Sequence, residues 1–195
     1  VLNKDKHNAD AIGVLGLIAH QTGNQEVAIR LLIKATEISP NKALHHFRLG
    51  NLYHSFGDLE SAVTSYQIAL KCDDSFHSVL VNLSNTLLAQ HKYRQAAVFS
   101  RRAIRQAPNS PEAFSNLGHA YLKQGRICDA HDALRKTVEL APHGSDLQNN
   151  FGVIQQLIGD VDGAVKTFQN VLKNNPKVTL SERNLKIAVL NLPSW

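Results

Sequence analysis

The sequence predicts an all-α fold, a solenoid of stacked antiparallel helix pairs. One motif recurs five times in steps of 34 residues along the 195-residue chain, and apolar residues within it have helical spacing. The composition is that of a globular protein, with 43% hydrophobic and 19% charged residues. Only 6% of the residues are aromatic, so small aliphatic side chains must fill the core.

Five columns carry the repeat when the chain is read in steps of 34. A large apolar residue precedes a small one at Gly16, Gly50, Ser84, Gly118 and Gly152. A turn residue follows seven positions later, at Gly23, Gly57, His91, Gly125 and Gly159. Alanine follows five positions further on, at Ala28, Ala62, Ala96, Ala130 and Ala164. Each repeat ends near Pro40, Asp74, Pro108, Pro142 or Pro176.

The columns indicate where two helices, A and B, meet and end. Small residues such as Gly118 on helix A and Ala130 on helix B are expected to touch. A helical glycine costs about 1 kcal/mol against alanine, so close packing must offset that cost. Proline cannot continue a helix and ends helix B. We therefore expect five repeats, at 9–42, 43–76, 77–110, 111–144 and 145–178.

The run L-G-x-x-Y at 117–121, followed by Gly125, Ala130 and Pro142, resembles the tetratricopeptide repeat family. This resemblance covers residues 9–178. It implies a right-handed superhelix in which helix A lines the concave face and helix B the convex face. Six positions depart from the family pattern, which questions local rigidity rather than the fold. They are Asp74, Ser84, His91, Ser100, Gln148 and Gln155.

Both ends of the chain extend beyond the five repeats. Residues 1–6 align with the end of a helix B, like 171–176, so 1–8 are expected to close a preceding repeat and the natural protein to extend upstream. Residues 179–195 allow two interpretations. They form a capping helix that starts near Ser181 and Glu182, or the run "KIAVLNL" is a buried strand that opens a following domain.

Asparagines recur at the helix A positions expected to face the groove. An amide offers two donors and an acceptor, so a row of amides can bind the backbone of an extended peptide without reading its sequence. The predicted peptide-binding residues are Asn51, Asn82, Asn85, Asn116, His119 and Asn150. Phe47, Leu88 and Leu122 are expected to add apolar contacts. In the competing interpretation, asparagine is merely tolerated at these positions.

The row formed by Asn82, Asn116 and Asn150 resembles the asparagine ladder of O-linked N-acetylglucosamine transferases and their SPINDLY-type relatives. By that resemblance, the three residues would grip a substrate polypeptide. Two functions therefore stay open. The chain is a scaffold that binds a peptide or partner protein along the concave groove, or it is the substrate-recognition domain of a larger glycosyltransferase.

Other function classes find little support in the sequence. The carboxylate clamp of chaperone-binding repeats needs cations where this chain has Gly13, Leu17, Asn82, Glu112 and Asn116. The histidines lack metal-ligand spacing, and no nucleotide-binding, hydrolase or metalloprotease motif occurs. We therefore expect no catalysis within this segment, no metal and no cofactor.

The charge pattern indicates a protein partner rather than nucleic acid or membrane. The formal net charge is only +5. Basic residues gather at Lys92, Arg94, Arg101, Arg102 and Arg105, which most simply form a solvated face of helix B.

The longest apolar stretch, 11–19, is too short to span a bilayer. The unpaired Cys72 and Cys128 favour a reducing, cytoplasmic location, and an exposed repeat end would allow self-association.

Overall fold

The protein is all-α in the computed structural model, which describes residues 8–190. Eleven helices and no strand occur in this range. Their bounds are α1 Ala9–Gln21, α2 Gln25–Ile38, α3 Ala43–Ser55, α4 Leu59–Cys72, α5 His77–Ala89, α6 Tyr93–Gln106, α7 Pro111–Lys123, α8 Ile127–Leu140, α9 Ser145–Leu157, α10 Val161–Asn174 and α11 Thr179–Leu190. Odd-numbered helices begin at intervals of 34 residues, from Ala9 to Thr179, and are of type A.

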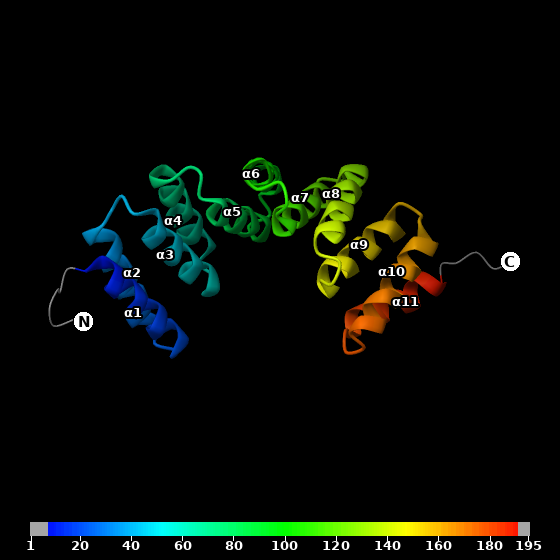
Figure 1. Cartoon of the computed structure of the whole chain (residues 1–195), viewed down its shortest axis with the longest axis horizontal. Helices are drawn as coiled ribbons and strands as arrows, with labels where there is room; N and C mark the ends of the chain where they lie inside the picture. The colour runs from blue at the N-terminus through cyan, green and yellow to red at the C-terminus, as the bar shows by residue number, and fades with distance from the viewer. Residues whose placement is uncertain (1–7, 191–195) are drawn as a thin grey trace. The chain divides into compact units, whose positions relative to one another are not determined.

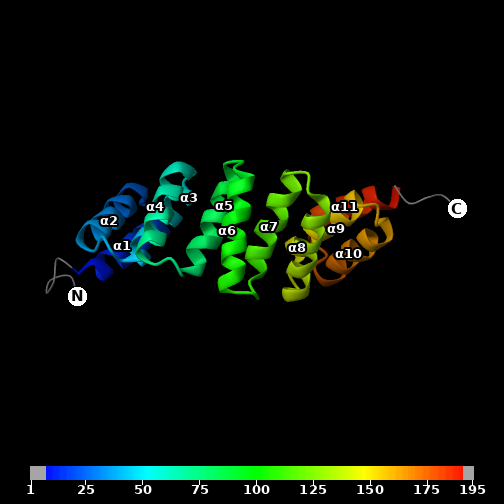
Figure 2. The ribbon, with the colours of Figure 1, turned by 90° about the horizontal axis from the view of Figure 1, so that it is seen from above.

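The chain divides into two compact units, residues 1–92 and 93–195. In the N-terminal unit, α1 packs against α2, and α3 packs against α4, each pair antiparallel (Figure 1). The A helices also touch, α1 with α3 and α3 with α5. In the C-terminal unit, α6 packs on α7, α7 on α8, and α9 on α10, while α11 contacts both α9 and α10 (Figure 2). Neighbouring helix pairs thus make a helical-hairpin repeat solenoid.

Helices A and B approach closely at the small-residue column. A Cβ atom built on Gly118 would lie 2.5 Å from Cγ of Leu134, and one on Gly50 would lie 2.6 Å from the Tyr66 ring. Close packing of the two helices therefore requires a residue without a Cβ atom at Gly50 and Gly118. The expected approach of Gly118 to Ala130 is confirmed, because the Ala130 carbonyl oxygen lies 3.4 Å from that Cβ position. The nearest side chain is that of Leu134, one turn beyond Ala130.

The turn between helices A and B uses the left-handed backbone region. The glycines of this column have φ near +80°, as at Gly57. His91 keeps the same conformation, with φ 59°. The turn geometry therefore persists where glycine is missing, at the steric cost that a Cβ atom carries in this region.

Gly57→Ala is expected to destabilise the protein by about 1 kcal/mol, because its φ is +80° and nothing within 4 Å would stabilise the added methyl group. His91→Gly should change stability in the opposite direction, because it relieves the same conformation. Urea unfolding of both variants checks this pair. Equal signs for the two changes would contradict it.

Departures from the repeat pattern are compensated locally. Helix α4 ends two residues before Asp74, as the other B helices end two residues before proline. There the Asp73 carboxylate accepts from the backbone N–H and hydroxyl of Ser75, 3.0 and 2.7 Å away. In α9 the buried Gln155 donates to Asp160 and accepts from Thr167. The polar substitution therefore leaves no orphaned group at that position.

The C-terminal segment is helical from Thr179 to Leu190, so residues 186–190 of the apolar run do not form the strand that the sequence also allowed. Helix α11 is held to α9 through the buried Asn149. Its Oδ1 atom accepts from the Ser181 hydroxyl at 3.1 Å and from the Asn184 amide at 3.0 Å. Residues 1–7 of the expected preceding repeat, and residues 191 and 192 at the end of the apolar run, lie outside the described residues.

Candidate functional site

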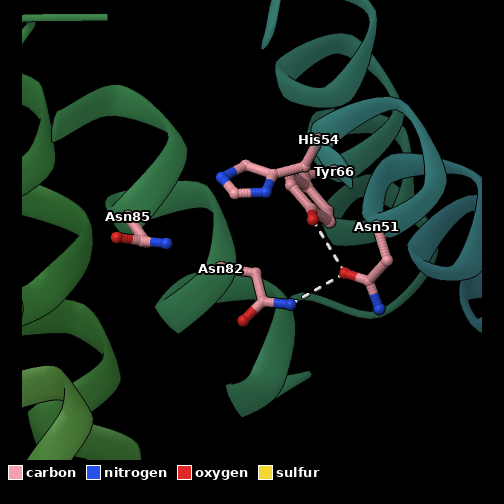
Figure 3. A pocket seen from close by; sticks show the side chains of 5 residues that line it. All are labelled: Asn51, His54, Tyr66, Asn82 and Asn85. Atoms are coloured by element: carbon pink, nitrogen blue, oxygen red, sulfur yellow. Dashed lines mark hydrogen bonds between the residues drawn. The ribbon is translucent and has the colours of Figure 1, made fainter. Parts of the chain in front are cut away.

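A polar recess of about 230 Å³ opens between α3, α4 and α5 in the N-terminal unit. Asn51 and His54 reach it from α3, Tyr66 from α4, and Asn82 and Asn85 from α5 (Figure 3). The two lining residues of α3 are three positions apart, and so are those of α5, so each pair lies on one face of its helix. The recess is therefore lined by three amides, an imidazole and a phenol.

One amide oxygen, Oδ1 of Asn51, accepts two hydrogen bonds in this recess. The Tyr66 hydroxyl donates to Oδ1 of Asn51 at 2.7 Å, and Nδ2 of Asn82 donates to the same oxygen at 2.7 Å (Figure 3). Burial raises the pKa of Tyr66 to about 12, so its hydroxyl stays a proton donor at neutral pH. The two bonds fix both amides. They leave Nδ2 of Asn51 as a donor and Oδ1 of Asn82 as an acceptor for a ligand.

Tyr66 reaches Asn51 because Gly50 lets its ring cross α3. The ring occupies the space that a Cβ on residue 50 would need. Phe47 packs beside it, with ring centroids 6.2 Å apart, and against Phe76 at 5.0 Å. Phe47 therefore supports the floor of the recess through these aromatic contacts. Tyr66 therefore belongs both to the packing column and to the polar site, because its ring packs against Gly50 and its hydroxyl donates to Asn51.

The walls of the recess carry no negative charge. Helices α3 and α5 contain no aspartate or glutamate, and Arg48 lies one turn before Asn51. At the start of α1, the carboxylate of Asp10 is paired with Lys42 at 2.7 Å. Nε2 of the fully buried His45 lies 3.5 Å from the same carboxylate, and burial lowers the pKa of His45. A ligand group would therefore meet no carboxylate among the five residues that line the recess.

The predicted residues fall into two groups. Asn51, Asn82 and Asn85 come together in the recess. Asn116 and His119 on α7, and Asn150 on α9, are half-buried in the C-terminal unit. The ladder position continues in α11 as Asn184, 34 residues after Asn150, but that amide donates to Asn149.

Sequence reasoning did not assign His54 and Tyr66 to the binding site. The signal for Tyr66 was its place 16 residues after Gly50, where three other repeats carry large residues that contact the helix A glycine, such as Leu134 after Gly118. Tyr66 is the one residue of that column that combines a ring with a hydroxyl, because the others are Leu32, Ser100, Leu134 and Phe168. His54 lies three residues after Asn51, which puts it on the same face of α3.

Acidification is expected to destabilise the C-terminal unit through His119. Burial lowers the pKa of His119, and the positive charge of Lys123 lowers it further. The unfolded chain therefore binds this proton at higher pH than the folded chain does. The stability is fully present above the ordinary histidine pKa of about 6.5 and is lost as the pH falls below it.

Thermal unfolding between pH 7.5 and 5 measures this effect, and His119→Gln should flatten the pH dependence. His143→Gln, at an exposed position before α9, is the matched control and should keep it. An unchanged slope in His119→Gln would contradict the assignment.

Comparison with known proteins agrees with this architecture. Three tetratricopeptide repeat models match the chain, at residues 14–75, 87–149 and 150–177. The chain belongs to the tetratricopeptide repeat family. Protein O-mannosyl-transferase TMTC3 of Homo sapiens is 24% identical over 96% of this chain. Hsp70-Hsp90 organizing protein 3 of Arabidopsis thaliana is 31% identical over 48% of it. The chain spans about a fifth of the O-mannosyl-transferases' length, 22%.

Solved tetratricopeptide repeat structures share the fold. YrrB, described as a TPR protein with an unusual peptide-binding site, superposes with a TM-score of 0.75 at 19% identity, over 95% of both chains. MamA of Desulfovibrio magneticus RS-1 gives a TM-score of 0.79 at 21% identity, over 87% of this chain and 96% of its own.

Three chemical features bear on function in residues 8–190. Cys72 and Cys128 are free thiols. No cluster of three or more histidine, cysteine or acidic side chains forms a metal site within this range. None of the helices described is both long and apolar enough to cross a membrane.

Proposed function

We propose that this tetratricopeptide repeat chain is a protein-interaction scaffold that binds an extended peptide segment, and that the recess between α3 and α5 is its anchor point. The observation that supports this most directly is the doubly accepting Oδ1 of Asn51. It orients two neighbouring amides, and the two bonds leave Nδ2 of Asn51 as a donor and Oδ1 of Asn82 as an acceptor. A peptide group offers the complementary pair, a carbonyl oxygen and an N–H.

The fixed amides favour binding because little side-chain entropy is lost when the ligand arrives. Asn85 offers a third amide on the exposed side of α5, one turn after Asn82. His54 closes the rim. Because amides recognise the backbone rather than side chains, the recess suits ligands of varied sequence.

A peptide selected from a random phage-displayed library on the immobilised chain provides the probe. Asn51→Ala combined with Asn82→Ala should weaken its binding about 10- to 30-fold, since two hydrogen bonds near 1 kcal/mol each are lost. Tyr66→Phe keeps the ring and removes only the bond that orients Asn51, so a smaller loss is expected.

The matched control removes two amides from a B helix. Asn170 and Asn174 are exposed on α10, and their alanine variants should bind the selected peptide as the wild type does. Equal binding by the Asn51/Asn82 variant and the wild type would overturn the proposal. A triple alanine variant of Asn82, Asn116 and Asn150, compared with Asn82→Ala alone, asks whether Asn116 and Asn150 of the C-terminal unit add to binding.

A second candidate function is substrate recognition within a larger glycosyltransferase. It is favoured by the likeness to an O-mannosyl-transferase across 96% of this chain. The narrower resemblance to O-linked N-acetylglucosamine transferases rests on the asparagine column alone. Intact mass of the natural protein separates the two candidates, because a value near 21.5 kDa leaves no room for a transferase domain. The cytoplasmic location stays a prediction from the two thiols.

We also propose that the repeats divide at 9–42, 43–76, 77–110, 111–144 and 145–178, with α11 as a capping helix. The 34-residue interval between successive A helices supports these boundaries. In α11 the small-residue column holds Lys186, which is exposed and donates to Glu182 at 2.7 Å. A charged side chain at that position disfavours close packing of a further B helix.

A further inference from the structure

The most unbalanced charge on the chain belongs to α6. It contains Arg94, Arg101, Arg102 and Arg105 and no acidic residue, whereas α2, α4, α8 and α10 each contain at least one carboxylate. Four charges on one helix compare with a formal net charge of +5 for the whole chain. The recess described above does not involve this helix.

Three of these arginines form a single stripe. Arg94, Arg101 and Arg105 are exposed, and their spacing of seven and four residues keeps them within a narrow arc of the helix. At a rise of about 1.5 Å per residue, the stripe is about 17 Å long. Val98 lies in the same arc and is 51% exposed. The opposite side of α6 is buried through Ala96, Ala97, Ser100 and Ala103.

Within residues 8–190 no carboxylate neutralises this stripe. Arg94, Arg101 and Arg105 have no hydrogen bond or ion pair with the described chain, whereas Arg102 is half-buried and does have an intramolecular partner. Asp129 and Glu139 of α8 form ion pairs with cations that are nearby in the sequence. Asp129 pairs with Arg126, and Glu139 pairs with both Arg135 and Lys136.

The stripe is unfavourable for the isolated helix. Arg94 stands in the first turn, where the helix dipole disfavours a cation, and no acidic residue accompanies it there. Arg101 and Arg105 are like charges four residues apart, which repel. Only Arg105, in the last turn, is at a position where the helix dipole favours a cation, so helix stability does not account for Arg94 and Arg101.

We propose that the face of α6 formed by Arg94, Val98, Arg101 and Arg105 docks an acidic segment of a partner protein. Carboxylates of that segment pair with the three guanidinium groups, and an apolar side chain covers Val98. The exposed valine at the centre of the stripe favours a protein segment over a polyanion. Tyr93 and Phe99 are half-buried, so neither ring is fully exposed for stacking on bases.

A synthetic 20-residue peptide of glutamate and leucine, labelled for fluorescence anisotropy, serves as the probe on the full chain. Replacing Arg94, Arg101 and Arg105 together by glutamine should weaken its binding about 10- to 100-fold and lower the salt dependence. Val98→Ser should weaken this peptide but leave binding of poly-glutamate unchanged. Arg135→Gln with Lys136→Gln removes two charges from α8 and should have little effect.

Three outcomes would overturn the proposal. These are unchanged binding by the triple glutamine variant, an equal loss in the α8 control, or tighter binding of a 20-residue oligo(dT) than of the peptide at equal salt. The last result would make the stripe a nucleic-acid contact instead. The Asn51/Asn82 alanine variant should bind this acidic probe normally, so failure here is distinguishable from failure of the peptide recess.

Discussion

Gly118→Val is expected to destabilise the C-terminal unit by about 3 kcal/mol. A Cβ atom at residue 118 would lie 2.5 Å from Cγ and 2.8 Å from Cδ2 of Leu134, closer than carbon atoms can approach. Leu134 is fully buried, so it cannot swing into solvent to make room. Either the side chain leaves its rotamer or α7 and α8 separate, and both options lose packing.

A double-mutant cycle makes this prediction specific. Leu134→Ala alone should cost about 2–5 kcal/mol through the cavity that it leaves. Combined with Gly118→Val, the cost should be less than the sum, because the valine fills part of that cavity. Urea unfolding of the four proteins measures the coupling. Gln169→Val, at an exposed site of α10, controls for valine in a helix. Additive losses would show that residues 118 and 134 do not share the space.

The fold was predictable because its determinants recur. One glycine in a helix is ambiguous, but glycine, turn residue and alanine at the same phase in successive repeats indicate helix pairs. The contact partner of Gly118 was not predictable from the columns alone. Side chains on a helix lean toward its N-terminus, so the surface near Ala130 is covered by Leu134, one turn later. Recurrence of small residues at one position of each repeat indicates a packed column, but it does not indicate which side chain of the neighbouring helix covers that column.

The site was predictable in part, because Asn51, Asn82 and Asn85 of its lining were among the predicted residues but their partners were not. Reading down a column aligns Asn82 with Asn116 and Asn150, each in a different repeat. The structure instead joins Asn82 to Asn51, a residue from another column of the preceding repeat. That pairing depends on the Tyr66 hydroxyl, and the column containing Tyr66 is otherwise apolar in three repeats, at Leu32, Leu134 and Phe168. A periodic pattern cannot indicate a feature that occurs in one repeat.

The largest effect is expected from Phe168→Ala in α10. Phe168 is fully buried and packs with Ala164 and Ala188, and its ring lies against Gly152. Removing the ring should cost about 3–5 kcal/mol, because Gly152 offers no side chain to fill the space. Since Ala188 belongs to α11, that helix loses apolar contact at the same time.

Hydrogen exchange distinguishes loss of α11 from loss of the whole unit. In Phe168→Ala the amides of residues 179–190 should exchange faster than those of α7 and α8, because α11 loses its largest apolar neighbour and keeps Leu185 and the polar bonds to Asn149. Leu157→Ala, at a side chain 57% exposed, should leave both stability and exchange nearly unchanged. Wild-type protection of α11 in Phe168→Ala would mean that Asn149, rather than the apolar core, holds this helix in place.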